Sequence, residues 1–448
     1  MSKPSINEQQ KTREPERHLS FLDIVFLSMG GQSPFLSILT YGLAAFLYAG
    51  LFGPIAIILG TLLVLINGLV VYELSKRFTK EGGYYTYAFY SLTKRLGFET
   101  GWLYVFYSLT YGVAYILGAT YVIYHVLGIS PWIVGLGIVG ITSIFAILGI
   151  RVSTKYAIVA ASLEIAVMTT LAFLFIQSTH FYFYNPFSVH INFSKLAFAI
   201  LFGSSIPTGY GSITPISGEA KNARKTISRA IITVILLGGL LAAFDVYAIG
   251  DHLVYFHLIS NVTKIDILNL IKDRLGIVTL VFVLFASIND GILGALAFLT
   301  ATSRTIFAMS SVGFLPKFLS KFENHKGPTR AVALSSILYI MLTALMLYIV
   351  KAPFLAFEIL GAIAVLSSLF VHLSSNFSLV RISLKKINKR KLQISIGLIA
   401  SVFSFFILIY SMEQASPIEV YVFMTWIIIG FLLAEIFSMI EEENEEED

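Results

Sequence analysis

The sequence contains no cysteine and few charged residues. Only 13% of its 448 residues are Asp, Glu, Lys or Arg, whereas a soluble globular chain carries about 25%. The absence of cysteine excludes disulfides, thiolate metal sites and cysteine nucleophiles. The first twenty residues are polar and lack the apolar core of a secretory signal peptide. The first apolar segment is therefore expected to serve as an uncleaved insertion signal.

Apolar residues dominate instead. They make up 56% of the chain, and the mean hydropathy is +0.81. Long charge-poor runs recur from Leu22 to Ile440, each near the roughly 20 residues that an α-helix needs to cross about 30 Å of hydrocarbon. Transmembrane β-strands would instead alternate apolar and polar residues. The sequence predicts an all-α integral membrane protein with twelve transmembrane helices, at 20–47, 51–76, 98–127, 131–150, 153–177, 194–218, 228–250, 276–308, 330–350, 354–380, 392–411 and 417–439.

The basic residues are distributed unevenly between the predicted helices. Of the 31 Lys and Arg, 26 lie on the N-terminal side and in alternate loops, and five lie on the other side, namely Lys195, Lys264, Lys272, Arg274 and Lys351. The positive-inside rule then predicts a multi-pass protein of the cell membrane with both termini cytoplasmic. The formal net charge of +5 is thus a topology signal for insertion beside anionic lipid, and no nucleic-acid partner is predicted.

These features divide the chain into segments. A cytoplasmic N-terminal tail is expected at 1–19, an extracellular amphipathic loop at 251–275, a basic cytoplasmic loop at 381–391, and a solvated, disordered acidic tail at 440–448. Helices one to seven occupy 20–250, comprising a first inverted repeat and the start of a second. Helices eight to ten complete the second repeat at 276–380, and two extra C-terminal helices follow at 392–439.

The first and sixth predicted helices are interrupted by glycine, proline and small polar residues. The interruptions are Met29–Pro34 and Gly203–Gly211. Their offset of five helices is typical of two inverted five-helix repeats that hold a substrate near the membrane midplane. A half-helix N-terminus attracts an anion and unpaired carbonyls attract a cation, so a zwitterion suits such a site. Close helix packing or a simple proline kink is the alternative interpretation.

Three further stretches resemble the amino acid/polyamine/organocation (APC) transporter superfamily. VYELSKRF at 71–78 with GGYYTY at 82–87 is similar to the family's YxELxxRFP and GGxYxY segment. GEAKNARKTISRA at 218–230 is similar to EExKNPRKTIPRA, and SRTIFAMSSVGFLP at 303–316 to SRxxYAMARDGxLP. The first break departs from the usual GSGIF, and Tyr210-Gly211 replaces an aromatic-acid pair. The resemblance covers about residues 20–440 and leaves the substrate open.

The resemblance implies an amino acid permease with alternating access, in which helices one, two, six and seven move against three, four, eight and nine. It implies that the substrate α-carboxylate binds the amides around the first break and the α-ammonium binds the carbonyls of the sixth helix. Tyr210 would be an aromatic lid. Tyr111 belongs to a tyrosine stripe on the third helix that either packs or reaches the substrate. The candidate substrate-binding residues are Gly30, Gly31, Gln32, Ser33, Phe35, Ser205, Ile206, Thr208, Tyr210 and Tyr111.

Two carboxylates lie deep in predicted helices, where a charge costs roughly 2.5–3.5 kcal/mol. Glu164 lies about 18 Å into the fifth helix, at a position where proton-coupled relatives often have a lysine, and Asp290 lies at similar depth in the eighth. Both are candidates for proton coupling. Coupling to Na⁺, or a structural hydrogen bond from a protonated Glu164, stays open. Asp245 is interpreted as a carboxylate at the external end of its helix.

Other function classes fit less well. An ion channel would show a charged pore ring, and an enzyme would show a motif such as HExxH or GxSxG; the sequence has neither. No catalytic residue, metal site or cofactor is predicted. The expected partners are an amino acid substrate, a coupling ion (H⁺ or Na⁺) and membrane lipid. Na⁺-coupled or exchange transport of amino acids, polyamines or other organic cations is the alternative, and a non-transporting nutrient sensor ranks lower.

Overall fold

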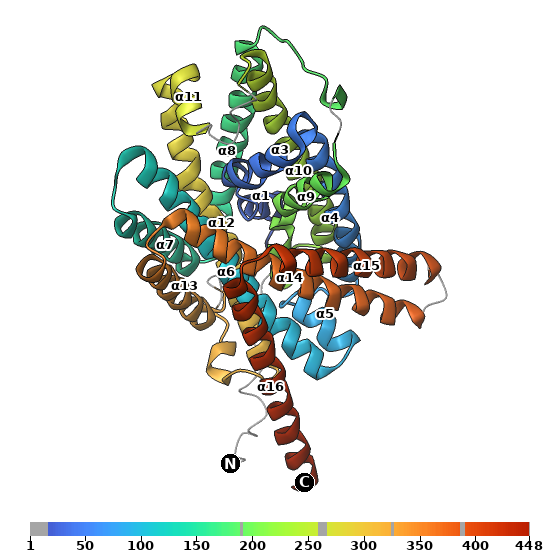
Figure 1. Ribbon diagram of the computed structural model, residues 1–448. Coiled ribbons are helices and arrows are strands. Elements are labelled where there is room, and N and C mark those ends of the chain that lie inside the picture. The colour runs from blue at the N-terminus through green and yellow to red at the C-terminus, as the bar shows by residue number, and fades with distance from the viewer. Residues whose placement is uncertain (1–16, 189–190, 259–266, 324–326, 386–389, 448) are drawn as a thin grey trace.

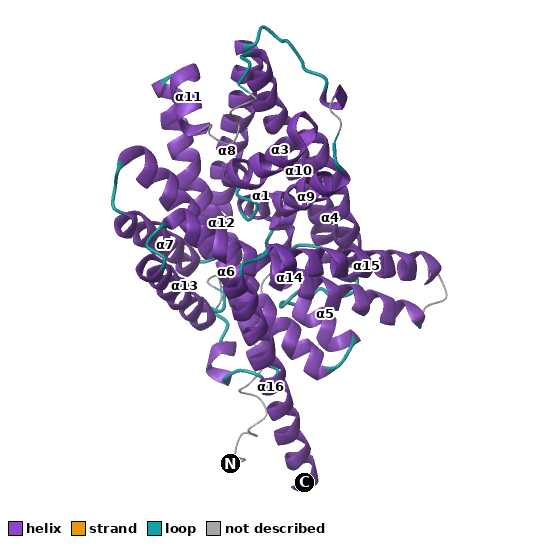
Figure 2. Ribbon diagram, viewed as in Figure 1, coloured by secondary structure: helices purple, strands orange, loops and turns teal. Residues whose placement is uncertain are grey.

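The computed structural model of the chain describes residues 17–188, 191–258, 267–323, 327–385 and 390–447. In these ranges the chain is helical apart from its connections and two isolated β-bridges (Figure 2). The α-helices are α1 (Phe21–Gly30), α2 (Pro34–Ser37), α3 (Leu43–Ala49), α4 (Gly53–Ser75), α5 (Tyr84–Ser91), α6 (Lys94–Leu127), α7 (Pro131–Leu148), α8 (Ile150–Ser178), α9 (Phe193–Ser205), α10 (Ala223–Tyr255), α11 (Ile267–Leu275), α12 (Ile277–Ser311), α13 (Thr329–Ile349), α14 (Pro353–Leu384), α15 (Arg390–Gln414) and α16 (Pro417–Glu447).

Shorter helical turns connect or extend these helices. The turn η2 (Ile38–Gly42) is a π-helix between α2 and α3. The others are 3-10 helices, namely η3 (Gly50–Phe52), η4 (Pro186–Ser188), η5 (Ile206–Ser212), η6 (Thr214–Glu219) and η8 (Lys317–Ser320). Both interrupted segments that the sequence predicts contain such irregular turns, so the breaks in the first and sixth helices are confirmed.

The described residues contain 11 helical segments that are long and apolar enough to cross a membrane. The first of them, Pro34–Ser75, is bent at Gly50, whose φ of 56° is a conformation that suits glycine. After this bend α4 packs against α3, and a Cβ on Gly53 would lie 2.8 Å from the Cα of Phe46. The segment therefore makes two passes, and α1 completes the first, which accounts for the twelve predicted helices.

The observed ends agree with the predicted ends to within five residues for the first eleven helices. The twelfth differs, because α16 continues to Glu447 and includes most of the tail predicted to be disordered. The predicted loop at 251–275 contains the end of α10 and the helix α11, whose Leu268 and Ile271 are buried while Lys272 is exposed. Within the segments given above, the predicted tail at 1–19 and the loop at 381–391 are described only in part.

The centre of the molecule is formed by α6, which packs against α12 and α14 (Figure 1). On one side, α4 packs against α10 and α9, and α1 packs against α8 and α10. The two last helices lie outside this group. Helix α15 contacts α14 and α4, and α16 contacts α6, where the rings of Trp102 and Trp426 stack 4.5 Å apart. The helix α5, which the sequence analysis did not predict, contributes the buried Tyr84 and Tyr87.

The two ends of the helix bundle are distinguished by their contacts. We call one end the terminal face; it carries Leu19, η6 and the connection 76–83. Leu19 pairs with Ala220 there in a parallel β-bridge. Helices α1 and α10 begin at this face, whereas α4 ends there. The opposite face carries the α3–α4 bend and α11, and Tyr184 Oη donates a hydrogen bond to the Leu51 carbonyl there.

We expect close backbone contact between α4 and α9 to be required for stability. A Cβ on Gly60 would lie 2.4 Å from the Ser204 nitrogen, so Gly60→Ala must push two backbones apart, at a cost of about 1–3 kcal/mol. The matched control is Gly137→Ala on α7, where an added Cβ meets no atom within 4 Å. Thermal unfolding in detergent should show a lower midpoint for Gly60→Ala and no loss for Gly137→Ala. Equal midpoints would contradict the expected crowding.

Candidate functional site

The first break consists of Gly31–Ser33, between α1 and α2. Ser33 adopts the left-handed conformation, with φ 42° and ψ 69°, which costs a non-glycine residue roughly 1–2 kcal/mol. Its hydroxyl donates to the carbonyl of Gly30 at 3.3 Å and to that of Asp290 at 3.2 Å. Gly30 and Gly31 lie against α12, where added Cβ atoms would be 2.8 Å from Leu293 Cβ and 3.2 Å from Ala297 Cβ. The break is thus held against the eighth predicted helix.

Two carboxyl groups cap the half-helix that follows this break. The Phe35 amide donates to Glu164 Oε1 at 3.4 Å, and the Leu36 amide donates to Asp290 Oδ2 at 2.8 Å. Glu164 and Asp290 are 1% and 0% exposed, and their carboxyls lie close together because they accept from adjacent amides. The structure therefore brings together the two predicted coupling residues, at the positive end of a helix dipole.

Asn289 completes this group, which we call the carboxyl pair. Its Nδ2 donates to Glu164 Oε2 at 3.1 Å and to the Ala160 carbonyl at 3.2 Å, and its Oδ1 accepts from Tyr156 Oη at 3.0 Å. The sequence analysis missed Asn289 because it considered only ionisable residues in the apolar segments. The groups around the carboxyl oxygens are hydrogen-bond donors, which suit a carboxylate or a shared proton, whereas a metal cation prefers further oxygen ligands.

The second break lies in the sixth predicted helix. Helix α9 ends at Ser205, and the 3-10 turn η5 follows with a non-helical ψ of 32° at Pro207. Tyr111 on α6 lies beside this turn. Its hydroxyl is 2.6 Å from Thr208 Oγ1 and donates to the Ser205 carbonyl at 3.3 Å. Of the tyrosine stripe on this helix, Tyr111 thus reaches the start of the break, and Tyr104 Oη donates to the Gly211 carbonyl at its end, at 2.8 Å.

The two breaks are in direct contact. A Cβ on Gly209 would lie 2.4 Å from the Gln32 backbone nitrogen, so only glycine fits there. Ser28 Oγ donates to the Gly209 carbonyl at 3.1 Å. The Gln32 side chain donates from Nε2 to the Val234 carbonyl at 2.9 Å, and the Gln32 carbonyl accepts from Tyr115 Oη at 3.2 Å. The predicted candidates Gly30, Gly31, Gln32, Ser33, Ser205, Thr208 and Tyr111 therefore form one connected region.

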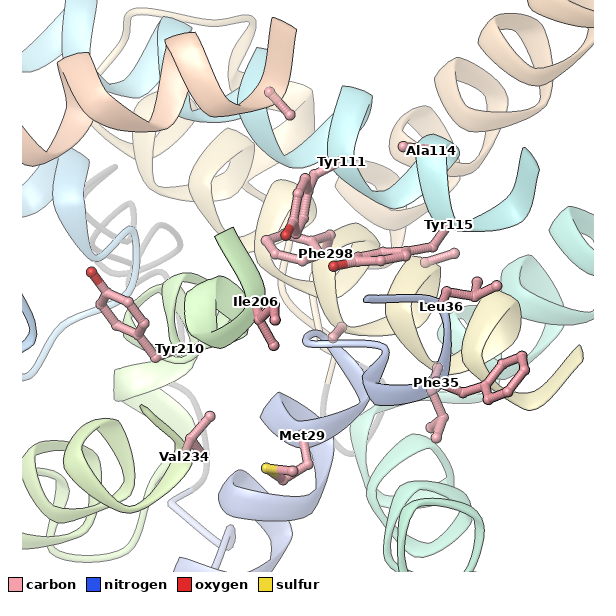
Figure 3. Packing of buried hydrophobic residues seen from close by; sticks show 14 of the residues in the cluster. Met29, Phe35, Leu36, Tyr111, Ala114, Tyr115, Ile206, Tyr210, Val234 and Phe298 are labelled. Carbon is pink, nitrogen blue, oxygen red and sulfur yellow. The ribbon is translucent and has the colours of Figure 1, made fainter. Parts of the chain in front are cut away.

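Three predicted residues are arranged differently around this region. Figure 3 shows Ile206 facing the group of Tyr111, Tyr115 and Phe298. The Phe35 ring points away from this group, although its backbone belongs to the first break. Tyr210 also points away from Tyr111 (Figure 3), and its hydroxyl is 3.2 Å from His372 Nε2 on α14. In this structure Tyr210 does not cover the space between the two breaks.

A large cavity opens on the face opposite the termini and reaches the second break. Its volume is about 650 Å³, and its walls come from η2 and α3, α9, the start of α14, and the adjoining ends of α15 and α16. Ser205 lies in its wall. Glu358 and Glu419 also line it, and no Lys or Arg is among its lining residues. We call this cavity the vestibule; its charge favours ligands that carry an ammonium group.

The terminal face is closed by a buried ion pair. Arg304 Nε and Glu219 Oε1 are 2.8 Å apart, and each side chain is 2% exposed. The Glu219 carbonyl also accepts from the Leu19 amide at 3.0 Å. Breaking a buried pair by removing one partner typically costs 3–5 kcal/mol, because the other charge stays buried. The end of the sixth predicted helix is thereby fixed to the start of α1 and to α12.

Glu81, in the connection between α4 and α5, lies beside this ion pair. Its carboxyl packs against Gly218, where an added Cβ would overlap Glu81 Oε1. Burial raises the pKa of Glu81 to about 7, and the nearby Glu219 adds to this rise. A backbone hydrogen bond and the charges of Arg304 and Arg17 act in the opposite direction. Glu81 therefore changes its charge near neutral pH while the terminal face is closed.

These features together define the class of protein. Over the residues that the structure describes, the chain is a helical bundle with 11 apolar segments, and its two broken helices meet beside a cavity. This is the architecture of a secondary transporter. The sequence profile of the amino acid permease family matches residues 23–412, and the chain belongs to this family of the APC superfamily. No curated protein matches the chain. Membership of this family indicates a transporter of amino acids or related organic substrates rather than an enzyme.

We expect the closure of the terminal face to depend on pH through Glu81. In the closed form the pKa is about 7, whereas an exposed glutamate has a value of 4.5. Protonation therefore stabilises the closed form as pH falls below 7, and this advantage is lost as pH rises through 7. Between pH 8 and pH 6 the closed-to-open ratio should rise about tenfold.

Labelling of a single introduced cysteine can measure this change, because the natural chain has none. Ser217 is buried at the terminal face, and the maleimide labelling rate of Ser217→Cys reports its opening. The thiol itself reacts more slowly at low pH, so the same variant carrying Glu81→Gln serves as the control. Between pH 8 and pH 6 the labelling rate should fall about tenfold more when Glu81 is present than in this control. An equal fall in both would count against the role of Glu81.

Proposed function

We propose that this amino acid permease moves amino acids across the cell membrane by alternating access and couples transport to protons through Glu164 and Asp290. The observation that carries the proposal is the carboxyl pair at the N-terminus of α2. Two carboxyl groups that contact each other inside a protein share a proton more readily than they both ionise. The pair can therefore take up a proton in one conformation and release it in another.

The Phe35 amide offers a physical route for coupling. In the helical turn from Pro34, Phe35 donates its hydrogen bond to Glu164 at 3.4 Å, longer than the 2.8 Å bond from Leu36 to Asp290. A hydrogen bond to a carboxylate weakens when the carboxylate is protonated. Protonation of Glu164 thus frees the Phe35 amide for the α-carboxylate of the substrate. In this structure the amides of Gly31, Gln32 and Ser33 already donate to backbone carbonyls.

The substrate ammonium group would lie at the second break. The Ser205 carbonyl and Thr208 hydroxyl, together with Tyr111, provide its polar contacts, and Ile206 provides an apolar one. The vestibule supports this arrangement because it carries Glu358 and Glu419 and leads to Ser205. A zwitterionic amino acid would enter with its ammonium group attracted by the vestibule and its carboxylate directed to the positive end of α2.

Alternating access would follow from movement of one helix group against another. Helices α1–α4, α9 and α10 form the moving group in this proposal, and α6, α7, α12 and α13 form the scaffold. The ion pair of Glu219 and Arg304 joins the two groups at the terminal face, so its release is required before substrate can leave on that side. The excess of basic residues at this face supports a cytoplasmic position for both termini.

Transport coupled to Na⁺, or exchange of amino acids, polyamines or other organic cations, is the second candidate function. The acidic vestibule favours it for cationic substrates. A thermal-shift screen of the purified protein against amino acids and polyamines identifies the substrate, and uptake under imposed H⁺ or Na⁺ gradients separates the two candidates. Accumulation driven by Na⁺ alone would replace the proton proposal with this one.

We expect Glu164→Gln to abolish accumulation driven by a pH gradient. Glutamine keeps an oxygen that can accept from the Phe35 amide, but it cannot take up and release a proton. Proteoliposomes containing the variant should accumulate at least tenfold less substrate than those with the natural chain, while exchange at equal pH persists. The matched control is Asp23→Asn, since Asp23 caps α1 at the terminal face, away from the pair. Unchanged accumulation by Glu164→Gln would refute the proton role.

A second prediction concerns Tyr111. Tyr111→Phe removes the hydroxyl that is proposed to contact the substrate ammonium group, a loss of about 1 kcal/mol, which corresponds to about fivefold weaker substrate binding. Tyr339→Phe is the control, because Tyr339 Oη donates to the Ser108 carbonyl at 2.7 Å in the scaffold. Isothermal titration with the best amino acid from the screen should show weaker binding only for Tyr111→Phe. Equal weakening in both variants would indicate a general effect on packing.

A further inference from the structure

Asp245 is a buried carboxyl group that the proposed function does not use. It lies on α10, its exposed fraction is 3%, and neither carboxyl oxygen has a hydrogen-bond partner among the described residues. The sequence analysis interpreted it as a carboxylate at the external end of its helix, whereas the structure places it inside the protein. An ionised carboxylate at this position would lie in an apolar environment without compensation, which is costly.

Asp245 lies in the wall of a small cavity. The walls of this cavity come from α2, η2, α3, α8, α10 and the helix α11 on the opposite face. Among the residues that the structure describes, all that line it are apolar except Asp245. Its volume is about 30 Å³, which is room for about two water molecules. An amino acid does not fit there, so the cavity is separate from the vestibule and from the substrate site.

The chemistry of the cavity selects its ligand. A metal cation held by protein oxygens needs several ligands, and the lining supplies the oxygens of one carboxyl group only. A proton needs one oxygen and no further ligand. Once protonated, the Asp245 carboxyl is neutral and suits the apolar walls. The cavity therefore fits a proton and does not fit Na⁺.

The cavity adjoins the carboxyl pair. The Phe35 ring lines it, while the Phe35 amide donates to Glu164. Met168 also lines it and lies four residues after Glu164 on α8, about 6 Å along the helix axis. The Phe35 residue therefore forms part of the wall of the cavity while its amide belongs to the carboxyl pair.

Buried titratable groups lie on the described helices around this cavity. On α8 this group is Glu164 of the carboxyl pair. Farther along α10, Asp251 accepts from Thr179 Oγ1 at 2.6 Å, and His252 Nδ1 lies 2.7 Å from Ser178 Oγ. On α11 the buried Ile271 lines the cavity, whereas the charged residues Lys272, Asp273 and Arg274 are exposed. On α2, η2 and α3 only apolar residues line it.

We propose that Asp245 is a second proton-binding site, which receives protons from the face opposite the termini and passes them to Glu164 and Asp290. The proposal rests on the proposed proton-coupled function for the second step, while proton binding by Asp245 stands by itself. The apolar cavity isolates the proton from the vestibule, so that proton and substrate reach the carboxyl pair by separate routes. The Phe35 ring is the barrier between the two proton sites.

Proton binding can be measured without transport. Infrared spectra of the purified protein at successive pH values should contain the carbonyl band of a protonated carboxyl group in an apolar environment. The band should be absent in Asp245→Asn and shifted in frequency in Asp245→Glu, and it should be unchanged in the control Asp23→Asn. Because Asp245→Glu keeps the carboxyl group, it assigns the band even if Asp245→Asn does not fold. A spectrum that is the same in the natural chain and in Asp245→Glu would overturn the proposal.

Transport tests the second step. In proteoliposomes, Asp245→Asn should accumulate substrate under a pH gradient at least tenfold more slowly than the natural chain, with substrate affinity within twofold. Accumulation equal to that of the natural chain would overturn the route through Asp245. If the natural chain itself does not respond to a pH gradient, the proton-coupled function fails and the route fails with it, while the infrared result still decides whether Asp245 binds a proton.

Discussion

The structure depends on how the backbone amides at the N-terminus of α2 find hydrogen-bond acceptors inside the bundle. A helix that begins within hydrocarbon leaves amide groups without partners, and each costs several kcal/mol there. Pro34 removes one amide, and the carboxyls of Glu164 and Asp290 accept from the next two. These acceptors come from α8 and α12, so one requirement of the backbone fixes the broken helix to two others. The break is stable because the two carboxyl groups accept these hydrogen bonds.

The same requirement explains why the two breaks contact each other. Irregular backbone in a membrane must be buried in protein or line a cavity. Gly209 lies so close to Gln32 that no side chain fits between them, and the Ser28 hydroxyl donates to the Gly209 carbonyl. Each irregular segment thus supplies packing and hydrogen-bond partners for the other. On the remaining side, Ser205 lies in the wall of the vestibule.

Much of this arrangement could be predicted from the sequence. Hydropathy located the helices, and clusters of glycine, proline and serine located both breaks, because proline removes a helix hydrogen bond and glycine permits an irregular backbone. The end of α16 lies outside the hydrocarbon, where hydropathy does not mark the end of a helix. The cost of a buried charge singled out Glu164 and Asp290. Their contact with each other, and the burial of Asp245, depend on helix rotation and packing that a single sequence does not encode locally.

A single amide that can donate to either of two acceptors is sufficient to couple the binding of a proton to the binding of substrate. If the Phe35 amide binds either an ionised Glu164 or the substrate carboxylate, then ionisation of Glu164 weakens substrate binding by some factor. Thermodynamic linkage requires that bound substrate strengthens proton binding by the same factor. A factor of ten corresponds to about 1.4 kcal/mol, which is within the range of a charge-assisted hydrogen bond. If the Phe35 amide is shared in this way, the geometry at α2 would supply enough energy to couple the two ligands without any further contact between them.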